Sequence, residues 1–571
     1  MKRRHFLCAS AALGTLPLTP FALAQDGAFD ALVEQFLEAL WQIDPDAAVS
    51  AGRFEFAPQI TLPGRAPRER MRSFLTGWRK TFEQQPEAPL STPQRMDRRM
   101  LIDKLDSDLW QLDVLREWAW NPSVHNPAGT LDLLLNTDYA PLPERVKALR
   151  PRIAALPAYY RAARGSLSGV TKEHTELAVQ QAPGVLGVLD DIARRAAETG
   201  QAASLKAPLA QARAAVQAYV AHLNKLLPTA RRPFRIGAEI YEAKFAHDIQ
   251  SARTAKETYE LALQRREEVL ASMWQQATAL WPGVMGGEAM PEDRFARIGR
   301  VIDKLSAKHV ARERFVEEIR AQIPQLEAWV RDHDLVSQDR AKPLIVRETP
   351  EYERGVAGAS IEAPGAYRPQ GNTYYNVTPL DDLTPEQAES SLREYNHWIL
   401  QILNIHEAIP GHYTQLVHAN RVPGKVKALF GNGAMVEGWA VYGERMMIES
   451  GYGTQNGEGP EMLLMWGKWH LRSVTNTILD YGVHVLGMER AAALDLLTRQ
   501  AFQTGREAAE KWRRVQLTSV QLTSYFSGYS EIFALREALK ARPGFVLKDF
   551  HEKFLGYGNA PVRLIAADML K

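Results

Sequence analysis

Two histidines and a glutamate in the C-terminal half are residue types that bind catalytic metal ions. His406 and His412 enclose the sequence H-E-A-I-P-G-H, and Glu437 follows within E-G-W-A. Two imidazoles and one carboxylate leave the fourth position of a tetrahedral Zn²⁺ ion to water. We expect His406, His412 and Glu437 to bind one zinc ion, with manganese or cobalt as alternative metals.

The spacing of the two histidines requires a break in the helix that carries them. Helical residues four apart lie about 40° apart around the axis, so both can reach one ion. His406 and His412 are six apart, which on a regular helix means about 240° of rotation and about 9 Å of rise. Proline clashes with the carbonyl four residues back, and glycine permits the dihedral angles of a bulge. We therefore expect a broken or bulged helix at Pro410–Gly411.

Four further residues could take part in the chemistry. Glu407 adjoins the first histidine, where it could take a proton from metal-bound water and pass it to a leaving amine. The alternative for Glu407 is a helix-surface residue. Glu444 shares the helical face of Glu437, and Asp480 and His484 are four apart. These three could orient the metal ligands by hydrogen bonds or form ordinary buried ion pairs.

These motifs resemble those of a bacterial family known as domain of unknown function 885. H-E-A-x-P-G-H followed by E-G-W-A is similar to the family pattern. Three further stretches resemble patterns of the family. Gly371–Asn376 resembles G-x-x-Y-Y-N, and Leu479–His484 resembles V-D-x-G-x-H. Gln521–Gly528 resembles Q-x-x-x-Y-x-x-G. The resemblance covers the C-terminal third well and the N-terminal half loosely. The family is itself similar to the angiotensin-converting-enzyme-like and thermostable-carboxypeptidase-like helical zinc metallopeptidases.

The resemblance implies a fold and a further site residue. The implied fold is mostly α-helical, large and two-lobed, with a deep central cleft and a small β element near the site. In the similar peptidases a tyrosine from the C-terminal part stabilises the oxyanion, a task that suits a phenol donor. Tyr525 is the candidate here, and Tyr529 shares its helical face. Either tyrosine could instead be a core aromatic.

Most of the chain carries helical patterns. Apolar residues recur at spacings of three and four over Phe29–Val49, and capping boxes occur at Thr254–Glu257 and Thr384–Gln387. We expect the second capping box to begin one helix that continues to His406.

Strand patterns are few. Leu344–Val346 and Thr373–Val377 are the best candidates. We expect them to form the small β element beside the site. Its edge could hold an extended peptide by strand addition, or the strands could merely close off a helical lobe.

The N-terminus has the features of an export signal. Residues 1–24 combine a basic start, an apolar run and small residues at the end. Arg3 and Arg4 fit the twin-arginine pattern, and an ordinary secretory signal is the alternative. Cys8, the single cysteine, precedes the apolar run, so we do not expect it to be a lipid anchor. The prediction is a periplasmic or secreted protein without a stable membrane anchor after cleavage.

Size and charge narrow the function further. Residues 25–571 are more than one compact core usually holds, so we expect two lobes, about 25–340 and 341–571. A net charge of +2 gives no reason to expect nucleic acid as a partner.

The leading hypothesis is an exported zinc metallopeptidase that cleaves short peptides. The alternatives are a hydrolase of a non-peptide amide or ester, and a non-catalytic metal- or peptide-binding protein.

Overall fold

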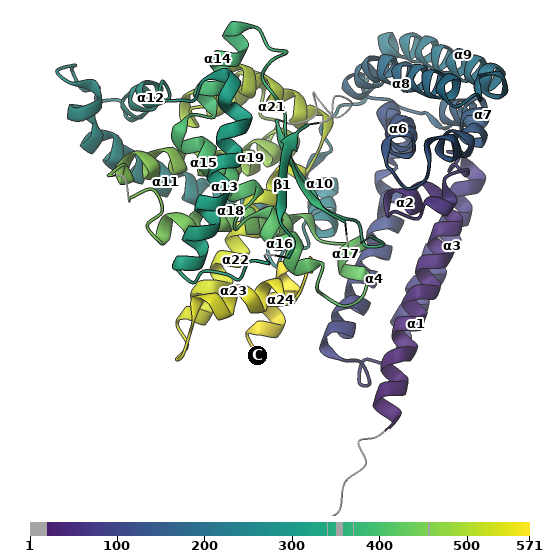
Figure 1. Ribbon diagram of the computed structural model, residues 1–571, viewed down its shortest axis with the longest axis horizontal. Coiled ribbons are helices and arrows are strands. Elements are labelled where there is room, and N and C mark those ends of the chain that lie inside the picture. Colours follow the sequence, from purple (N-terminus) through teal and green to yellow (C-terminus); the bar gives the residue numbers. More distant parts are fainter. Residues whose placement is uncertain (1–19, 340, 350–357, 369–370, 455–456) are drawn as a thin grey trace, which may run out of the picture.

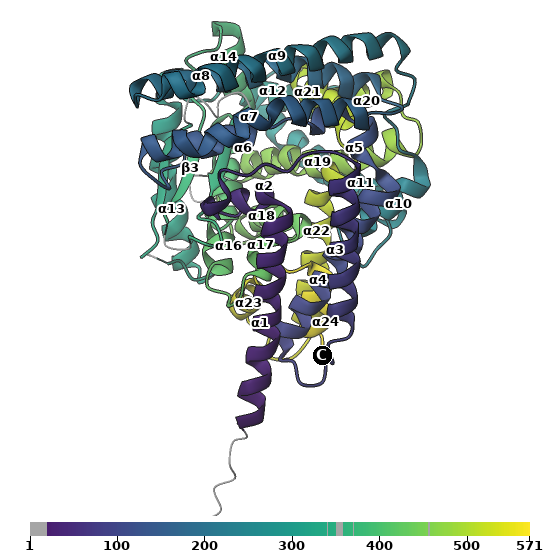
Figure 2. The same cartoon turned by 90° about the vertical axis from the view of Figure 1, so that its right-hand side faces the viewer.

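The N-terminal part of the chain is a stack of helices. The computed structural model describes residues 20–339, 341–349, 358–368, 371–454 and 457–571. The predicted signal lies outside these residues, except for 20–24, which belong to the first helix. The helices of this part are α1 (Pro20–Ile43), α2 (Pro45–Ser50), α3 (Arg65–Glu83), α4 (Thr92–Trp110), α5 (Glu117–Trp120), α6 (Ala128–Asn136), α7 (Leu142–Ser166), α8 (Lys172–Glu198) and α9 (Ala202–Leu226). In Figure 2, α7, α8 and α9 run across the top, and α1, α3 and α4 stand below them.

The rest of the chain surrounds the sequence motifs. Its first helices are α10 (Gly237–Asp248), α11 (Ala255–Met285), α12 (Arg294–Leu305) and α13 (Phe315–Asp332). After the strands follow α14 (Pro385–Glu394), α15 (His397–Glu407), α16 (His412–Ala419), α17 (Val426–Leu429), α18 (Gly433–Glu449), α19 (Gly459–His484), α20 (Arg490–Asp495), α21 (Gly505–Leu517), α22 (Ser524–Lys540), α23 (Leu547–Leu555) and α24 (Val562–Met569). The mostly helical fold predicted from the sequence is confirmed (Figure 1).

Two helices predicted from periodicity are interrupted. The stripe over Phe29–Val49 breaks at Asp44, whose carboxylate accepts a hydrogen bond from the Ala47 N–H and caps α2. The single helix expected from Thr384 to His406 is also wrong, because α14 ends at Glu394 and α15 begins at His397. The Asn396 side chain accepts hydrogen bonds from the first free N–H groups of α15. Both breaks are local caps, which periodicity alone does not reveal.

A small sheet lies against the site-bearing helices. It contains β1 (Leu344–Glu348), β2 (Ala359–Glu362) and β3 (Thr373–Val377) in the order β1-β3-β2. β1 is parallel to β3, and β2, which the sequence did not predict, is antiparallel to it. β3 is thus the central strand, so a peptide added at an edge would pair with β1 or β2.

A buried chain of hydrogen bonds anchors β3 to α15. The Tyr375 hydroxyl donates to Asn404 Oδ1 at 2.9 Å, and Asn404 Nδ2 donates to Gln322 Oε1 on α13 at 2.7 Å. Asn404 lies two residues before His406 and is fully buried. The expected β element near the site is therefore present, and it fixes the last turn of α15.

The N-terminal stack contacts a site-bearing helix and the connection between β2 and β3. The Lys427 ammonium on α17 pairs with buried Asp97 on α4, and Trp41 Nε1 donates to the Tyr367 hydroxyl at 2.9 Å. Helices α11 and α13 precede the lobe boundary expected near residue 340, yet they pack against α19 and α15. The division into two lobes at that point stays a prediction. None of the helices in the described ranges has both the length and the apolarity of a membrane span.

Helices α18 and α22 touch backbone to backbone at two glycines. A Cβ atom at Gly528 would lie 1.7 Å from the Ala434 carbonyl oxygen, and one at Gly438 would lie 2.3 Å from the Gly528 carbonyl carbon. No side chain fits there, because both distances are far below van der Waals contact. Gly438 follows Glu437 directly, so this contact determines how close α22 comes to the predicted metal ligand.

We predict that Gly528→Ala lowers the stability of the protein by about 1–3 kcal/mol or more, because α18 and α22 must move apart. Gly184→Ala on α8 is the matched control, since a Cβ there meets nothing within 4 Å. It should leave stability unchanged or raise it slightly. Urea unfolding of the two variants beside wild type measures the difference. Equal midpoints for all three proteins would contradict the close-contact interpretation.

Candidate metal centre

The helix that carries His406 is broken where the sequence predicted it. α15 ends at Glu407 and α16 begins at His412. Between them the Gly411 N–H donates to the Ile405 carbonyl, six residues back, at 2.9 Å. The Ile409–Pro410 peptide bond is cis. The break brings the two imidazoles to one place, with ring centroids 4.8 Å apart.

Gly411 is required for space, and its φ of −74° is one that other residues adopt. A Cβ atom at this position would lie 1.8 Å from the His406 carbonyl oxygen and 2.3 Å from that of Ile405. The Trp439 indole N–H donates to the Pro410 carbonyl at 2.8 Å and holds the turn against α18. The turn is thus fixed from within by a close backbone approach and from outside by a buried tryptophan.

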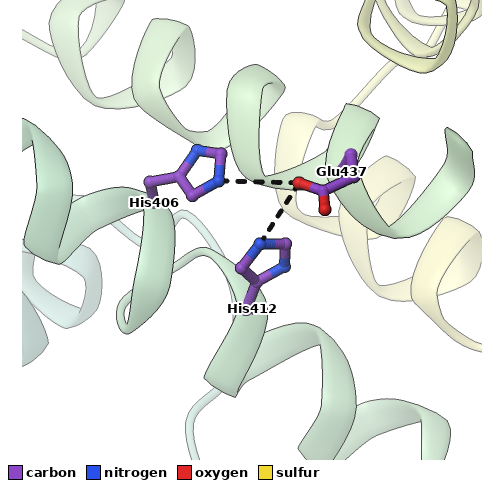
Figure 3. A group of neighbouring side chains, drawn as sticks. All are labelled: His406, His412 and Glu437. Carbon is purple, nitrogen blue, oxygen red and sulfur yellow. Dashed lines mark ion pairs between the residues drawn. The ribbon is translucent and has the colours of Figure 1, made fainter. Parts of the chain in front are cut away.

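Three side chains from three helices converge in Figure 3. Nε2 of His406 lies 3.7 Å, and Nε2 of His412 3.5 Å, from Oε2 of Glu437. In a tetrahedral zinc site with bonds of about 2.1 Å, ligand atoms are separated by about 3.4 Å. The arrangement therefore fits one small divalent cation with little movement. The Glu437 side chain is 26% exposed, so solvent reaches this cluster.

Glu444 orients the first histidine. Its Oε1 accepts hydrogen bonds from His406 Nδ1 at 2.7 Å and from Trp469 Nε1 at 3.0 Å. With the proton on Nδ1, the Nε2 lone pair of His406 points toward Glu437. A carboxylate behind a ligand histidine is the usual support of a metal site. Glu444 therefore contacts a predicted ligand, His406. This agrees with the interpretation that Glu444 orients the metal ligands by hydrogen bonds.

The charges of the cluster favour a cation. Burial lowers the pKa of the His406 imidazole, but hydrogen bonds to Glu437 and Glu444 raise that pKa well above its usual value. Burial likewise opposes ionisation of Glu437, yet the two imidazoles hold its pKa well below the usual range. The carboxylates therefore favour positive charge between the imidazoles, which a divalent cation supplies.

Glu407 lies beside the cluster without belonging to it. The residue as a whole is half-buried, and burial raises the pKa of its carboxyl group, while His412 and His406 lower that pKa and Glu437 raises it further. It also acts electrostatically on the Tyr375 hydroxyl of β3. A carboxyl group with a raised pKa next to a cation site can accept a proton and return it. The position predicted for a general base is therefore occupied by a suitable group.

Asp480 and His484 do not reach the cluster. The Asp480 carboxylate accepts the N–H groups of Val520 and Leu522 at 3.2 and 3.1 Å. His484 Nε2 lies 2.9 Å from each of two carbonyl oxygens, those of Val515 and Thr518. The pair therefore fixes the segment that leads into α22, which is a structural role.

The two tyrosines differ in their surroundings. The Tyr529 hydroxyl is bonded to Arg445 Nη1 at 2.6 Å and its ring is buried. Tyr525 lies in the first turn of α22, half-buried, one turn before Gly528. Within the described residues its hydroxyl has no hydrogen-bond partner. Tyr529 therefore has a structural partner, whereas Tyr525 keeps a free donor.

A family comparison covers nearly the whole chain. A family model described as a bacterial protein of unknown function, DUF885, matches residues 45–569. The chain belongs to the DUF885 family. The matched span includes every candidate site residue. The likeness of the family to zinc metallopeptidases stays a prediction.

Solved structures show the same fold in other bacteria. A candidate lipoprotein of unknown function from Shewanella oneidensis is 46% identical, with a TM-score of 0.89 over 95% of this chain and 100% of that one. A second, from Colwellia psychrerythraea, is 16% identical, with a TM-score of 0.77 over 95% of this chain and 98% of the other. The latter likeness concerns the fold alone. No curated protein matches the chain.

Three residues of the stretch E-G-W-A have a physical role in this geometry. Glu437 faces the histidines, Gly438 permits the contact with α22, and Trp439 holds the Pro410 turn. Sequence reasoning missed Trp469 and Asn404. A polar residue on an otherwise apolar helical face was the available signal for Asn404, and nothing near Trp469 distinguishes it from a core aromatic.

We predict that Glu444→Gln lowers the affinity for Zn²⁺ by about 10- to 100-fold, because an amide supports the His406 N–H less well than a carboxylate. Glu449→Gln, on the same helix, is the control, since its partners are Arg445 and Arg536. Competition with a chelating indicator measures both affinities. Equal affinities in wild type and Glu444→Gln would show that the contact has no part in metal binding.

Proposed function

We propose that this DUF885 protein is a metal-dependent hydrolase that cleaves peptide bonds in short peptides. The single observation that carries the proposal is the convergence of His406, His412 and Glu437, with Glu407 next to them. Two imidazoles and one carboxylate form a donor set suited to Zn²⁺. A purely structural cluster would not need a second carboxyl group beside it.

The chemistry divides between the ion and the protein. A bound divalent cation polarises a carbonyl group and acidifies water. His406, His412 and Glu437 would hold such an ion, and Glu444 fixes the orientation of His406. Glu407 takes the proton of the attacking water and delivers it to the leaving amine, which requires a carboxyl group able to gain and lose that proton.

Tyr525 is the proposed donor to the developing oxyanion. α22 meets α18 at Gly528 and Gly438, and Tyr525 precedes Gly528 by one turn of α22, which supports this role. Its hydroxyl has no partner in the described part of the chain, whereas Tyr529 is bonded to Arg445. A phenol donor without another partner suits this role.

We further propose that the protein acts outside the cytoplasm. The Shewanella oneidensis protein, 46% identical to this chain, is described as a candidate lipoprotein, and the first residues of this chain resemble an export signal. Lipoproteins are attached to the cell envelope. An envelope or periplasmic location would give a peptidase access to imported or cell-surface peptides.

Two substitutions separate metal binding from catalysis. Glu407→Gln should keep the ion, because no ligand is changed, and should lower turnover by about 10²–10⁴-fold. His412→Ala should lose both metal and activity, because two protein ligands rarely retain zinc. The controls are Glu260→Gln, in an exposed pair on α11, and His418→Ala on α16.

The measurements are metal content by elemental analysis and hydrolysis of peptide, amide and ester panels with and without chelator. Near-normal turnover by Glu407→Gln would exclude it as the general base. Hydrolysis of amides or esters but not of peptides would show that the substrate is not a peptide. Metal binding without hydrolysis of any panel would favour a non-catalytic binding protein.

A further inference from the structure

A polar cavity lies where helices α12, α14 and α19 meet the segment that precedes α21. Its volume is about 270 Å³. Lys468, Glu394 and Gln503 form part of its wall, together with Arg393 and Asp303. The predicted metal ligands are not among the residues that line it. The cavity is therefore separate from the metal centre, and it has room for a molecule larger than a single water.

The carboxamide of Gln503 is buried without a partner. Gln503 is 4% exposed, and neither its Oε1 nor its Nε2 has a hydrogen-bond partner within the described residues. A buried amide in this state bears the full cost of leaving water. Because most buried polar side chains in proteins are hydrogen-bonded, this exception points to a molecule that binds beside it.

The backbone holds Gln503 in the cavity wall through a strained turn. The preceding residue, Phe502, has a left-handed conformation with a φ of 57°, which is uncommon for a bulky side chain. The Gln503 N–H donates to the Leu497 carbonyl, six residues back, at 3.0 Å. The position of the Gln503 backbone is thus fixed, as a preorganised binding site requires.

Lys468 supplies unused donors to the same cavity. Its side chain is 3% exposed, and its ammonium binds Glu394 Oε2 at 2.7 Å. An ammonium group has three N–H donors, and in the described ranges only Glu394 accepts from this one. Glu394 therefore balances the charge of Lys468, while two buried donors keep no acceptor in those ranges.

The second ion pair of the cavity is open to solvent. Arg393 Nη2 binds Asp303 Oδ1 at 2.8 Å, and the two side chains are 31% and 81% exposed. The wall carries two cations and two carboxylates, so its charges cancel. A ligand that suits this wall has no net charge. It needs an acceptor for the N–H groups of Lys468 and Gln503, and a donor for Gln503 Oε1.

We propose that this cavity binds a free α-amino acid in its zwitterionic form. The carboxylate of the amino acid accepts hydrogen bonds from Lys468 Nζ and Gln503 Nε2. Its ammonium group donates to Gln503 Oε1 and faces the carboxylate of Asp303. Hydrogen bonds of this charge-assisted kind are the strong ones in proteins, and here they satisfy the buried groups that have no partner in the described chain.

This site goes beyond the proposed hydrolase function, because binding in the cavity does not require hydrolysis. Free amino acids are also products that a peptidase acting on short peptides can release. Lys468 directly precedes Trp469 on α19, and Trp469 Nε1 donates to Glu444. A residue of the cavity wall is thus the chain neighbour of the tryptophan that supports the metal centre.

Thermal unfolding of wild type with each common amino acid in turn tests for the ligand. At least one amino acid should raise the unfolding midpoint, because it binds the folded chain. Calorimetry then compares that amino acid with its C-terminal amide and its N-acetyl derivative. Each derivative lacks one of the two charged groups, so its Kd should be about 10-fold higher or more. If no amino acid binds, or if either derivative binds as tightly, the inference is overturned.

Variants of Gln503 locate the site. Gln503→Leu removes the amide, and Gln503→Glu keeps its size but repels the carboxylate of the ligand, so both should abolish binding. Gln322→Leu is the matched control. Gln322 is also 4% exposed, but its amide is bonded to Glu318 and Asn404, and its replacement should leave binding intact. Binding that persists in both Gln503 variants would place the amino acid elsewhere and overturn the assignment.

Urea unfolding without ligand gives a second, independent result. Gln503→Leu should raise the unfolding midpoint, because an apolar group replaces a buried amide that lacks partners. Gln322→Leu should lower it, because the buried Asn404 amide loses its acceptor. A lower midpoint for Gln503→Leu, together with no binding of any amino acid by wild type, would show that ordered waters alone fill the cavity and would overturn the inference.

Discussion

The break between α15 and α16 is the constraint on which the rest of the site depends. Two histidines six residues apart can share an ion only if the helix between them is interrupted. Gly411 permits the interruption because its backbone lies against the His406 carbonyl oxygen, where a Cβ atom has no space. Trp439 then holds the Pro410 carbonyl. The helix that supplies Glu437 therefore also fixes the turn that brings the histidines together.

Around this break, neighbouring elements each fix one degree of freedom. The sheet holds the last turn of α15 through Tyr375 and Asn404, and Glu444 sets the rotation of the His406 ring. The glycine contact sets the distance between α18 and α22. A site positioned by helices and buried hydrogen bonds loses little entropy when it binds an ion. Such a rigid site suits catalysis better than a cluster of side chains on loops would.

Much of this site could be predicted from the sequence because its chemistry is local. The motif H-E-A-I-P-G-H contains two of the three proposed ligands together with the break that brings them to one place. The roles of Asn404 and Trp469 depend on partners far along the chain, which periodicity and spacing do not reveal. The break at Asn396 and strand β2 were missed for another reason. A single capping side chain decides the first, and pairing with β3 creates the second.

The most direct test of the account is X-ray absorption spectroscopy at the zinc edge on protein loaded with one equivalent of Zn²⁺. The account predicts stoichiometric binding, with two imidazole nitrogens and further oxygen ligands at about 2.0–2.2 Å. Replacing His412 by alanine should remove one imidazole from the spectrum or abolish binding. Failure to bind zinc, or an ion bound without imidazole ligands, would contradict the claim that the broken helix builds a metal centre.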